Sequence, residues 1–543
     1  MSGAPTKKRL LILGGGLAGA HLAARIKGRL QLQDNLDIGI VDYNNASVWH
    51  GLLPQVISGL VQAQYTLAPL RRAVHGVTHY NNMIERIDLP NRRVFVSRGD
   101  ERAQMILEYD YLALILGSVT DVNRFPGIVE HGFQTKTIGD AMHLRNHLID
   151  MLEQASMEPD PAERRRMLTF VVAGAGFAGV EIGGQSNEFI RSILRFYPSI
   201  QPSEIRFVLL SNSPRILPAL SEELAARTMR FLEAQGVEFR TGISIASATA
   251  ATAILTTGER IPTRTVIVTV GIGTNPVVAD LPVDFVHGRI ACDQYCRVLD
   301  WPGVYAVGDN AAIPDLQRGG FYPPTGIAAF GGATSAADNI LADLRGQRPH
   351  ECRILPFEAL LPTKGYCLMQ FGGLKLDGPA AGVFLRLVWL VNMHTWQHRT
   401  MLASDWILRA IFPRDISQLP LSRTDTIVPM RFAPGEVIIR EGDPGSRFYI
   451  ITEGEVEVIR ELPDGPEEAV ARLGSGQHFG EIALIYGVTR TATIRALVET
   501  QVLSLARQDF NALVKHLPAL RDAFDSHLRK IGGVPEREGS GTP

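Results

Sequence analysis

Short apolar runs that end in glycine-rich turns open the chain and recur near residue 170. Residues 9–13 form the first run, and a helical pattern over residues 17–30 follows the turn. Residues 168–173 form a second run, again followed by a glycine-rich turn and a helical pattern. Apolar runs of four to eight residues bounded by turns are typical of strands that are buried on both faces of a parallel sheet. The pattern therefore predicts an α/β fold that contains two similar strand–turn–helix units.

The pattern changes after about residue 425. Glycines now separate short apolar segments, which include residues 436–441, 448–461 and 491–506. Short strands that alternate regularly with such turns indicate an antiparallel roll or barrel. Residues 507–530 then show a helical pattern that would close this domain. We therefore predict a C-terminal β-roll that is separate from the α/β part of the chain.

A third pattern occupies residues 379–414, which are rich in Leu, Val, Ile and Trp. This segment holds three of the five tryptophans and four arginines, against the single acid Asp405. Apolar residues with aromatic and basic neighbours suit helices that lie in a membrane interface. A helical hairpin buried within the protein, or in the contact of a homodimer, is the alternative. No run of 18 or more apolar residues occurs, so we expect no helix to span a bilayer.

The amino-acid composition argues against several kinds of protein but does not indicate a function. The chain has 543 residues, which predicts three or four domains, and its formal net charge of -2 gives no argument for nucleic-acid binding. The four cysteines are too few for a disulfide framework, so we expect a reducing compartment. No metal site is predicted. The N-terminal residues run directly into the first glycine turn and do not form a signal peptide.

The glycines of the first turn carry candidate chemistry. Gly14, Gly16 and Gly19 match GxGxxG, and the next predicted strand ends at Asp42. In this arrangement one glycine turns the chain, one admits a pyrophosphate, and one lets the helix touch the strand. The phosphates would lie at the helix N-terminus, and Asp42 could accept hydrogen bonds from ribose hydroxyls. The first unit is therefore predicted to be a Rossmann-like dinucleotide-binding domain.

The second turn repeats the fingerprint but lacks the acid. Gly174, Gly176 and Gly179 lie between a strand and a helix, whereas the following strand ends in Ser-Asn-Ser at residues 211–213. A carboxylate there binds a ribose 2′-hydroxyl and repels a 2′-phosphate. Its absence, with Arg215 nearby, leaves the choice between NADH and NADPH open.

Two further strand ends complete the pattern. Within residues 303–312, an apolar strand is followed by Gly308 and Asp309. Within residues 109–118, another apolar strand is followed by Gly117. The order of these signals resembles that of two-dinucleotide-binding flavoproteins. The resemblance implies FAD on an outer domain, approached by Gly117, Gly308 and Asp309, and NAD(P)H on a domain inserted into it.

Within these flavoproteins the chain resembles type II NADH dehydrogenases, which are NADH:quinone oxidoreductases of membrane surfaces. The resemblance covers about residues 8–415 and rests on stretches at residues 51–59, 176–184 and 322–333, among others. It implies that Glu181 lies where the nicotinamide meets the flavin and that the hairpin docks on a membrane. Ile327 and Gly331 stand where the family has two glutamines that line the quinone pocket. This departure leaves open a flavin reductase that uses another acceptor.

The stretch at residues 479–494 resembles the phosphate cassette of a cyclic nucleotide-binding domain. Arg490 offers a fork of N–H donors to a cyclic phosphate. Gly480 opens a short helix whose N–H groups face the same anion. Glu481 could accept the ribose 2′-hydroxyl, and Thr491 could bond a guanine amino group or the phosphate. The resemblance implies cAMP or cGMP as an effector, and too few residues follow the domain for a helix-turn-helix that would bind DNA.

Together with these patterns, the resemblances imply an FAD-dependent NAD(P)H dehydrogenase, which we expect to be cytoplasmic and peripheral on the inner face of the cell membrane. It would pass electrons to a quinone or another small acceptor and respond to a cyclic nucleotide. A non-catalytic cyclic-nucleotide receptor with a redox-sensing flavin is the remaining alternative. The predicted domains are FAD-binding (1–165 and 286–345), NAD(P)H-binding (166–285), a C-terminal redox segment with the membrane-docking helices (346–420), cyclic nucleotide-binding (421–530) and a disordered tail (531–543).

Overall fold

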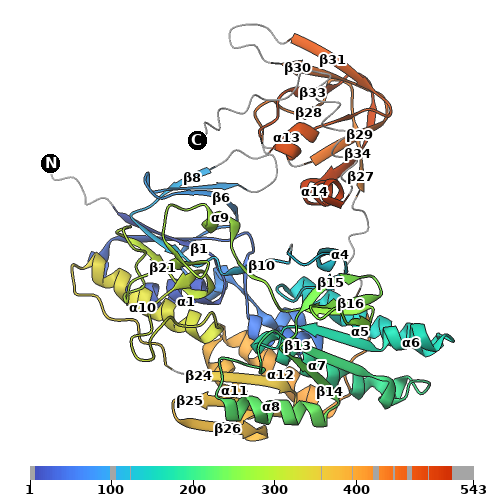
Figure 1. The fold of residues 1–543 in the computed structure, drawn as a ribbon. Coiled ribbons are helices and arrows are strands. Elements are labelled where there is room, and N and C mark those ends of the chain that lie inside the picture. Colours follow the sequence, from blue (N-terminus) through green and yellow to red (C-terminus); the bar gives the residue numbers. More distant parts are fainter. Residues whose placement is uncertain are drawn as a thin grey trace. The chain divides into compact units, whose positions relative to one another are not determined.

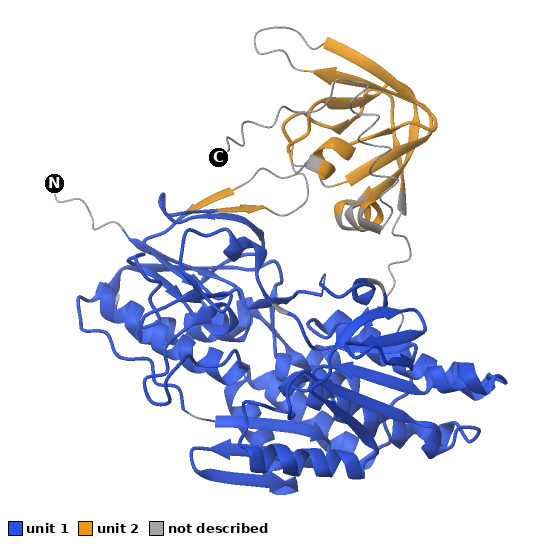
Figure 2. Cartoon of the chain, viewed as in Figure 1, with its two compact units in different colours: residues 1–94, 108–421 blue, residues 95–107, 422–543 orange. Residues whose placement is uncertain are grey.

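The chain divides into two compact units, which Figure 2 colours separately. The first comprises residues 1–94 and 108–421, and the second comprises residues 95–107 and 422–543. The structure is a computed structural model, and it describes residues 7–97, 105–122, 124–355, 357–393, 395–419, 427–443, 445, 447–460, 468–486 and 488–516.

A five-stranded parallel sheet forms the part of the first unit that contains the first glycine turn. Its strand order is β22-β9-β1-β2-β5, and every neighbouring pair is parallel. Residues 10–13 in the central strand are fully buried, as expected for a strand covered on both faces. The strands are β1 (Lys8–Leu13), β2 (Leu36–Val41), β5 (Thr78–Tyr80), β9 (Tyr111–Leu114) and β22 (Val304–Ala306), and helix α1 (Leu17–Arg29) follows β1.

A second parallel sheet contains the second glycine turn. Its order is β11-β18-β12-β13-β14, so the strand before the turn is again central. An antiparallel ribbon of β10 (Ser118–Thr120) and β19 (Ile272–Thr274) lies where the chain passes between the two sheets. The members of the second sheet are β11 (Gly132–Phe133), β12 (Thr169–Ala173), β13 (Arg206–Ser211), β14 (Val237–Thr241) and β18 (Thr265–Val268), with helix α7 (Phe177–Ile193) after β12.

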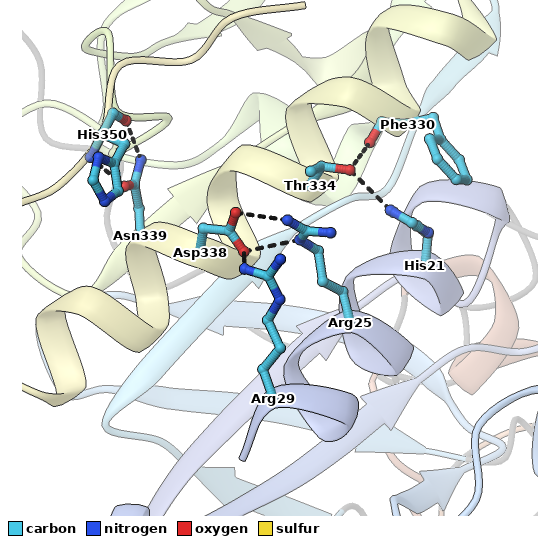
Figure 3. Close-up of polar contacts among 8 residues, drawn as sticks. All are labelled: His21, Arg25, Arg29, Phe330, Thr334, Asp338, Asn339 and His350. Carbon is cyan, nitrogen blue, oxygen red and sulfur yellow. Dashed lines mark hydrogen bonds and ion pairs between the residues drawn. The ribbon is translucent and has the colours of Figure 1, made fainter. Parts of the chain in front are cut away.

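Helix α10 (Gly326–Leu344) packs along α1, and polar side chains fix the pair (Figure 3). Arg25 donates from two nitrogens to the two carboxylate oxygens of Asp338, each at 2.8 Å. His21 bonds Thr334 at 2.9 Å and stacks on Phe330. A bidentate arginine–carboxylate pair sets the rotation of both helices as well as their distance. The start of α10, which carries Ile327, is therefore held beside the first glycine turn.

The end of the first unit is a three-stranded antiparallel sheet followed by two helices, as predicted for residues 379–414. The sheet contains β24 (Phe357–Thr363), β25 (Tyr366–Phe371) and β26 (Leu374–Gly378), and the helices are α11 (Pro379–Asn392) and α12 (Trp396–Ile411). Among the described residues, no helix is both long enough and apolar enough to cross a bilayer.

Strands within residues 427–506 of the second unit form two four-stranded antiparallel sheets, as the glycine-punctuated pattern predicted. Their orders are β27-β34-β29-β32 and β28-β33-β30-β31. Residues 517–543, which include the end of the predicted closing helix and the predicted disordered tail, lie outside the described residues. The elements are β27 (Ile427–Phe432), β28 (Val437–Ile439), β29 (Arg447–Glu453), β30 (Glu455–Arg460), β31 (Glu468–Gly474), β32 (His478–Phe479), α13 (Glu481–Tyr486), β33 (Thr493–Ala496), β34 (Thr500–Ala506) and α14 (Arg507–His516).

Other elements complete the first unit, and Figure 1 labels several of them. They include α2 (Leu53–Ile57), α5 (Ile138–Met157), α6 (Pro161–Met167), α8 (Glu222–Ala234), and the strands β15 (Ile245–Thr249), β16 (Thr252–Leu255), β17 (Arg260–Pro262), β20 (Phe285–Val286), β21 (Arg289–Ala291) and β23 (Ala311–Ala312). Helix α2 packs against α5 and α7, and so connects the two halves of the unit.

Candidate redox and nucleotide-binding sites

The first glycine turn has the shape that a dinucleotide requires. Gly14 has a φ of +106°, which favours glycine, and a Cβ on Gly19 would lie 1.8 Å from the carbonyl oxygen of Gly14. Helix α1 can therefore touch the turn only because residue 19 has no side chain. A Cβ on Gly16 would meet nothing within 4 Å, so the N-terminus of α1 opens onto free space. This open turn fits a pyrophosphate.

Asp42 lies beside this turn and also holds it. One carboxylate oxygen accepts the N–H of Gly15 at 2.6 Å, and the other accepts the N–H of Asn44 at 2.7 Å. Burial raises the pKa of Asp42 above its ordinary value, against the effect of these hydrogen bonds. An ionised carboxylate has further lone pairs that a ribose hydroxyl could use.

The second turn repeats this geometry in detail. Gly174 has a φ of +115°, and a Cβ on Gly179 would lie 1.9 Å from the carbonyl oxygen of Gly174. Gly176, like Gly16, faces open space within 4 Å. The N-terminus of α7 is therefore open to a second pyrophosphate.

The hydrogen bonds of the two turns show which residue replaces the missing acid. Gly14 donates to the carbonyl of Val41, and Gly174 donates to that of Leu210, so Ser211 corresponds to Asp42. The Ser211 hydroxyl donates to the Arg215 carbonyl and accepts the N–H of Ser213. The guanidinium of Arg215 bonds the carbonyls of Pro218 and Leu220, so it is bound to its own loop rather than free for a phosphate.

A polar cluster that sequence patterns did not predict surrounds Asp309. The Ser118 hydroxyl lies 2.9 Å from the Asp309 carboxylate, and the ammonium of Lys136 lies 2.9 Å from that hydroxyl and 4.0 Å from the carboxylate. Burial and the Lys136 charge lower the pKa of His50 nearby. Lys136 follows β11 of the second sheet, yet Asp309 follows β22 of the first. No local motif marks such a contact.

The predicted FAD-contacting glycines lie at the same end of the first sheet. Gly117 follows β9 and Gly308 follows β22, which pair in parallel. Both have a positive φ, and a Cβ on Gly117 would meet nothing within 4 Å. Together with Asp309 and Lys136 they offer donors and acceptors to a ribityl chain and a phosphate, so the residues present fit FAD.

Glu181 belongs to a polar stripe along one face of α7. The Glu181 carboxylate accepts the N–H of Leu361 at 2.6 Å, and the Gln185 amide donates to the Leu361 carbonyl at 3.0 Å. Glu188 accepts the N–H of Lys364 at 2.6 Å. A Cβ on Gly184 would lie 2.3 Å from the carbonyl oxygen of Pro362. The stripe therefore holds the backbone of residues 361–364 by hydrogen bonds, and that backbone lies directly against α7.

Burial raises the pKa of Glu181 from its ordinary value to about 7, because desolvation outweighs the Leu361 hydrogen bond. A carboxyl group that titrates near neutral pH can give or take a proton at the working pH. Gln185, fully buried next to it, also accepts the Ser58 hydroxyl at 2.9 Å. The family resemblance identified Glu181 as a candidate site residue, whereas Gln185 and Ser58 were not identified from the sequence.

The two positions that depart from the quinone-reductase pattern lie at the start of α10. Ile327 is half-buried. A Cβ on Gly331 would lie 2.9 Å from a side-chain carbon of Ile354, so a glutamine at 331 would require Ile354 to move.

All four cysteines are free and buried. Burial raises the pKa of Cys367 to about 12 and raises that of Cys292 further. Cys296 hydrogen bonds Cys352 rather than Cys292. The Cys292 and Cys367 thiols are therefore neutral at neutral pH, whereas the interaction with Cys296 lowers the pKa of Cys352.

The candidate cyclic nucleotide site lies between β29, α13 and β33 of the second unit. Arg490 is buried, and its guanidinium donates to the carbonyls of Gly480 at 2.9 Å and Arg447 at 2.8 Å. Glu481 is buried too and lies 3.4 Å from the His478 ring. Thr491 is exposed. The four predicted residues, Gly480, Glu481, Arg490 and Thr491, are thus close in sequence. Backbone carbonyls hold the guanidinium of Arg490 in place.

Comparison with known proteins finds relatives that cover between 56% and 75% of this chain. In Arabidopsis thaliana, an external alternative NAD(P)H-ubiquinone oxidoreductase is 28% identical over 56% of this chain, which spans only 55% of that protein's length. The demethylphylloquinone reductase NdbB of Synechocystis is 27% identical over 75% of this chain and 97% of its own. The type II NADH:quinone oxidoreductase of Mycobacterium tuberculosis is 26% identical over 71% and 84%.

Solved structures show the same fold. NDH2 from Plasmodium falciparum in complex with NADH superposes with a TM-score of 0.68 at 16% identity, covering 76% of this chain and all of that one. The sulfide:quinone oxidoreductase of Aquifex aeolicus gives 0.57 at 16% identity, covering 77% of this chain and all of that one.

Two family models match the chain. Residues 429–516 match the cyclic nucleotide-binding domain, which places that domain in the second unit. Residues 8–328, more than half of the chain, match the pyridine nucleotide-disulphide oxidoreductase model. The chain therefore belongs to the pyridine nucleotide-disulphide oxidoreductase family and carries a C-terminal cyclic nucleotide-binding domain.

Proposed function

We propose that the protein is an FAD-dependent NAD(P)H dehydrogenase that passes electrons to a quinone and is regulated by a cyclic nucleotide. The observation that carries this proposal is the pair of glycine turns, because Gly16 and Gly176 both face open space at helix N-termini. Bound FAD would supply the redox chemistry, taking a hydride from NAD(P)H and passing two electrons to the acceptor.

The residues of the first sheet would hold FAD. Gly14, Gly16 and Gly19 would admit its pyrophosphate, and Asp42 would accept its ribose hydroxyls. Gly117, Gly308 and Asp309 would lie along the ribityl chain, with Lys136 supplying a positive charge beside Asp309. Gly174, Gly176 and Gly179 would take the pyrophosphate of NAD(P)H in the same way. The domain boundaries given above are part of this proposal.

Glu181 would act as the proton-carrying group. Reduction of a quinone to a quinol by a hydride donor consumes a proton from the medium. A carboxyl with a pKa of about 7 is half protonated under working conditions and can supply that proton. Leu361 holds its other oxygen in place.

The proposal includes quinone as the acceptor and a peripheral position on the inner face of the cell membrane, and helices α11 and α12 support contact with a membrane. Phe384, Leu387 and Val391 lie on one face of α11 at helical spacing and are more than half exposed. Ile407 and Ile411 do the same on α12. Exposed apolar faces of this kind mark a membrane or protein contact. The named activities of the relatives in Arabidopsis, Synechocystis and Mycobacterium point the same way.

A non-quinone acceptor is the second candidate. Gly331 has no side chain and so offers no amide to a quinone carbonyl, and a Cβ there would lie 2.9 Å from a side-chain carbon of Ile354.

Anaerobic titration of the purified protein with NADH and NADPH, watching the flavin absorbance, tests the proposal. Bleaching of the flavin followed by turnover with a soluble quinone is the expected result. Bleaching without quinone turnover would favour the second candidate. A flavin that neither nucleotide reduces would leave a cyclic-nucleotide receptor.

We expect the enzyme to use NADPH and NADH with kcat/KM values within about tenfold of each other, because no carboxylate stands at Ser211 to repel a 2′-phosphate. A negative charge at position 211 should make the enzyme discriminate against NADPH. The Ser211→Asp variant is expected to lose roughly tenfold in kcat/KM for NADPH and little for NADH. Steady-state kinetics with both nucleotides measure this, and an equal loss for both would contradict it.

A further inference from the structure

The last segment of the first unit, residues 414–419, is bound along helix α5. The side chain of Asn146 donates to the carbonyl of Leu419 at 2.5 Å and accepts its N–H at 3.1 Å. Arg145 donates to the carbonyl of Asp415 at 2.5 Å. These contacts hold the segment directly before the chain enters the second unit at residue 422.

An ion pair connects the start of this segment to α7. Arg414 donates to Glu188 at 2.7 Å, and its side chain is only 7% exposed. Burial lowers the pKa of Arg414, but arginine remains a cation. Breaking such a buried pair leaves an uncompensated charge, so the pair holds the segment and the helix in one arrangement.

Glu188 also belongs to the polar stripe that carries Glu181. Its second oxygen accepts the N–H of Lys364, three residues along the chain from Leu361, whose own N–H goes to Glu181. Gln185 lies between them on the same face and bonds the Leu361 carbonyl. A displacement of Arg414 would therefore reach Glu181 through Glu188 and the backbone of residues 361–364.

We propose that Arg414 is a positioning residue of the redox centre, and that residues 414–419 are the element through which cyclic nucleotide binding acts on Glu181. This inference rests on the proposed function. The segment has two arrangements, bound to α5 and α7 or released, and the nucleotide favours one of them. Coupling free energies of this kind typically change activity severalfold, so we expect an effect of about fivefold on turnover in the natural protein.

The surroundings of Glu181 allow its titration to report on this element. Burial raises the pKa of the nearby Cys367 thiol of β25 to about 12, and the charge of Glu181 contributes to this increase. Cys367 is therefore neutral across the pH range of interest. A shift in the pH profile near 7 would report on how tightly residues 361–364 enclose Glu181.

The test uses the full-length, FAD-loaded protein and two variants. Asn146→Ala removes two hydrogen bonds to Leu419 without burying a charge, and Gln154→Ala on the same helix is its matched control, because Gln154 is exposed and bonds Asp150. Arg414→Met keeps the apolar stem and removes the ion pair. Nucleotide affinity by calorimetry, flavin content and thermal unfolding establish that each variant is folded and binds cAMP or cGMP.

We expect Asn146→Ala to bind the nucleotide normally, to keep basal turnover within about twofold, and to lose the nucleotide effect. Gln154→Ala should keep that effect. Arg414→Met should lose the nucleotide effect and also move the pH midpoint of turnover toward acid, because Glu181, which is half-buried, then becomes more exposed to water. A full nucleotide effect in both Asn146→Ala and Arg414→Met would overturn the inference, as would wild-type turnover that ignores a tightly bound nucleotide. A wild-type flavin that NAD(P)H cannot reduce would instead contradict the proposed function.

Discussion

Replacing Glu181 by Gln is expected to lower quinone-dependent turnover about 100-fold at pH 7, the scale typical of a lost general acid. Gln is close in size and can still accept the Leu361 N–H, so the contact between α7 and β24 persists. What disappears is the titratable proton. Steady-state turnover with a soluble quinone and stopped-flow absorbance of the flavin would measure the effect on each half-reaction.

The pH dependence gives the sharper test of the same substitution. Burial raises the pKa of Glu181 to about 7, so the group is protonated below that pH and ionised above it. Turnover that needs the protonated form should be present on the acid side and fall as the pH rises through 7. The Glu181→Gln variant should lack this transition. A variant that kept both the wild-type rate and the wild-type pH profile would show that Glu181 holds Leu361 by a hydrogen bond and does not supply the proton.

The glycine turns illustrate what sequence can predict. Each turn is a local structure in which a strand, a turn and a helix follow one another within about twenty residues, so spacing alone specifies the contacts. Gly19 and Gly179 stand where a Cβ would collide with a carbonyl, and both were identified by position. The short strands of the second unit were predictable from the glycines between them. Their pairing was not, because among the strands described within residues 427–506 only β30 and β31 are neighbours both in sequence and in a sheet.

The cluster at Asp309 illustrates what sequence cannot predict. Lys136 and Asp309 are brought together by the crossing of the chain between two sheets, and no periodicity encodes that path. The same holds for Glu188 and Arg414, which are 226 residues apart. Gly184 gave a hint in the sequence. Glycine inside a helix lowers stability, so its presence there suggests that another backbone segment comes close to the helix. Its partner, Pro362, could not have been named.

Arg215 shows a different limit. Its nearness to the second turn in sequence left a role with a 2′-phosphate open, but its guanidinium bonds the carbonyls of Pro218 and Leu220. The sequence correctly predicted that Arg215 lies in the loop after the second turn's following strand, β13. The direction of the side chain is set by the carbonyls of Pro218 and Leu220, whose positions are a property of the folded backbone.

Replacing Arg490 by Leu is expected to weaken cyclic nucleotide binding at least 100-fold. Hydrogen bonds to charged groups contribute about 1.5–3 kcal/mol each, and two bonds from one guanidinium to a cyclic phosphate would reach about 3 kcal/mol or more. Every 1.4 kcal/mol is a factor of about ten in affinity. The buried guanidinium already donates to the Gly480 and Arg447 carbonyls, so it is held in place before any phosphate arrives.

Isothermal titration with cAMP and cGMP measures this loss, and Arg495→Leu is the matched control. Arg495 lies on β33 close to Arg490 in sequence, but it pairs with Glu457 at 3.4 Å and is only partly buried. We expect its substitution to change the affinity by no more than about twofold, as for other partly exposed ion pairs. Because Arg490 belongs to the second unit, Arg490→Leu should keep its flavin and its basal NAD(P)H oxidation while losing any response to the nucleotide. Unchanged nucleotide affinity in a folded Arg490→Leu variant would mean that the second unit binds its ligand elsewhere or binds none.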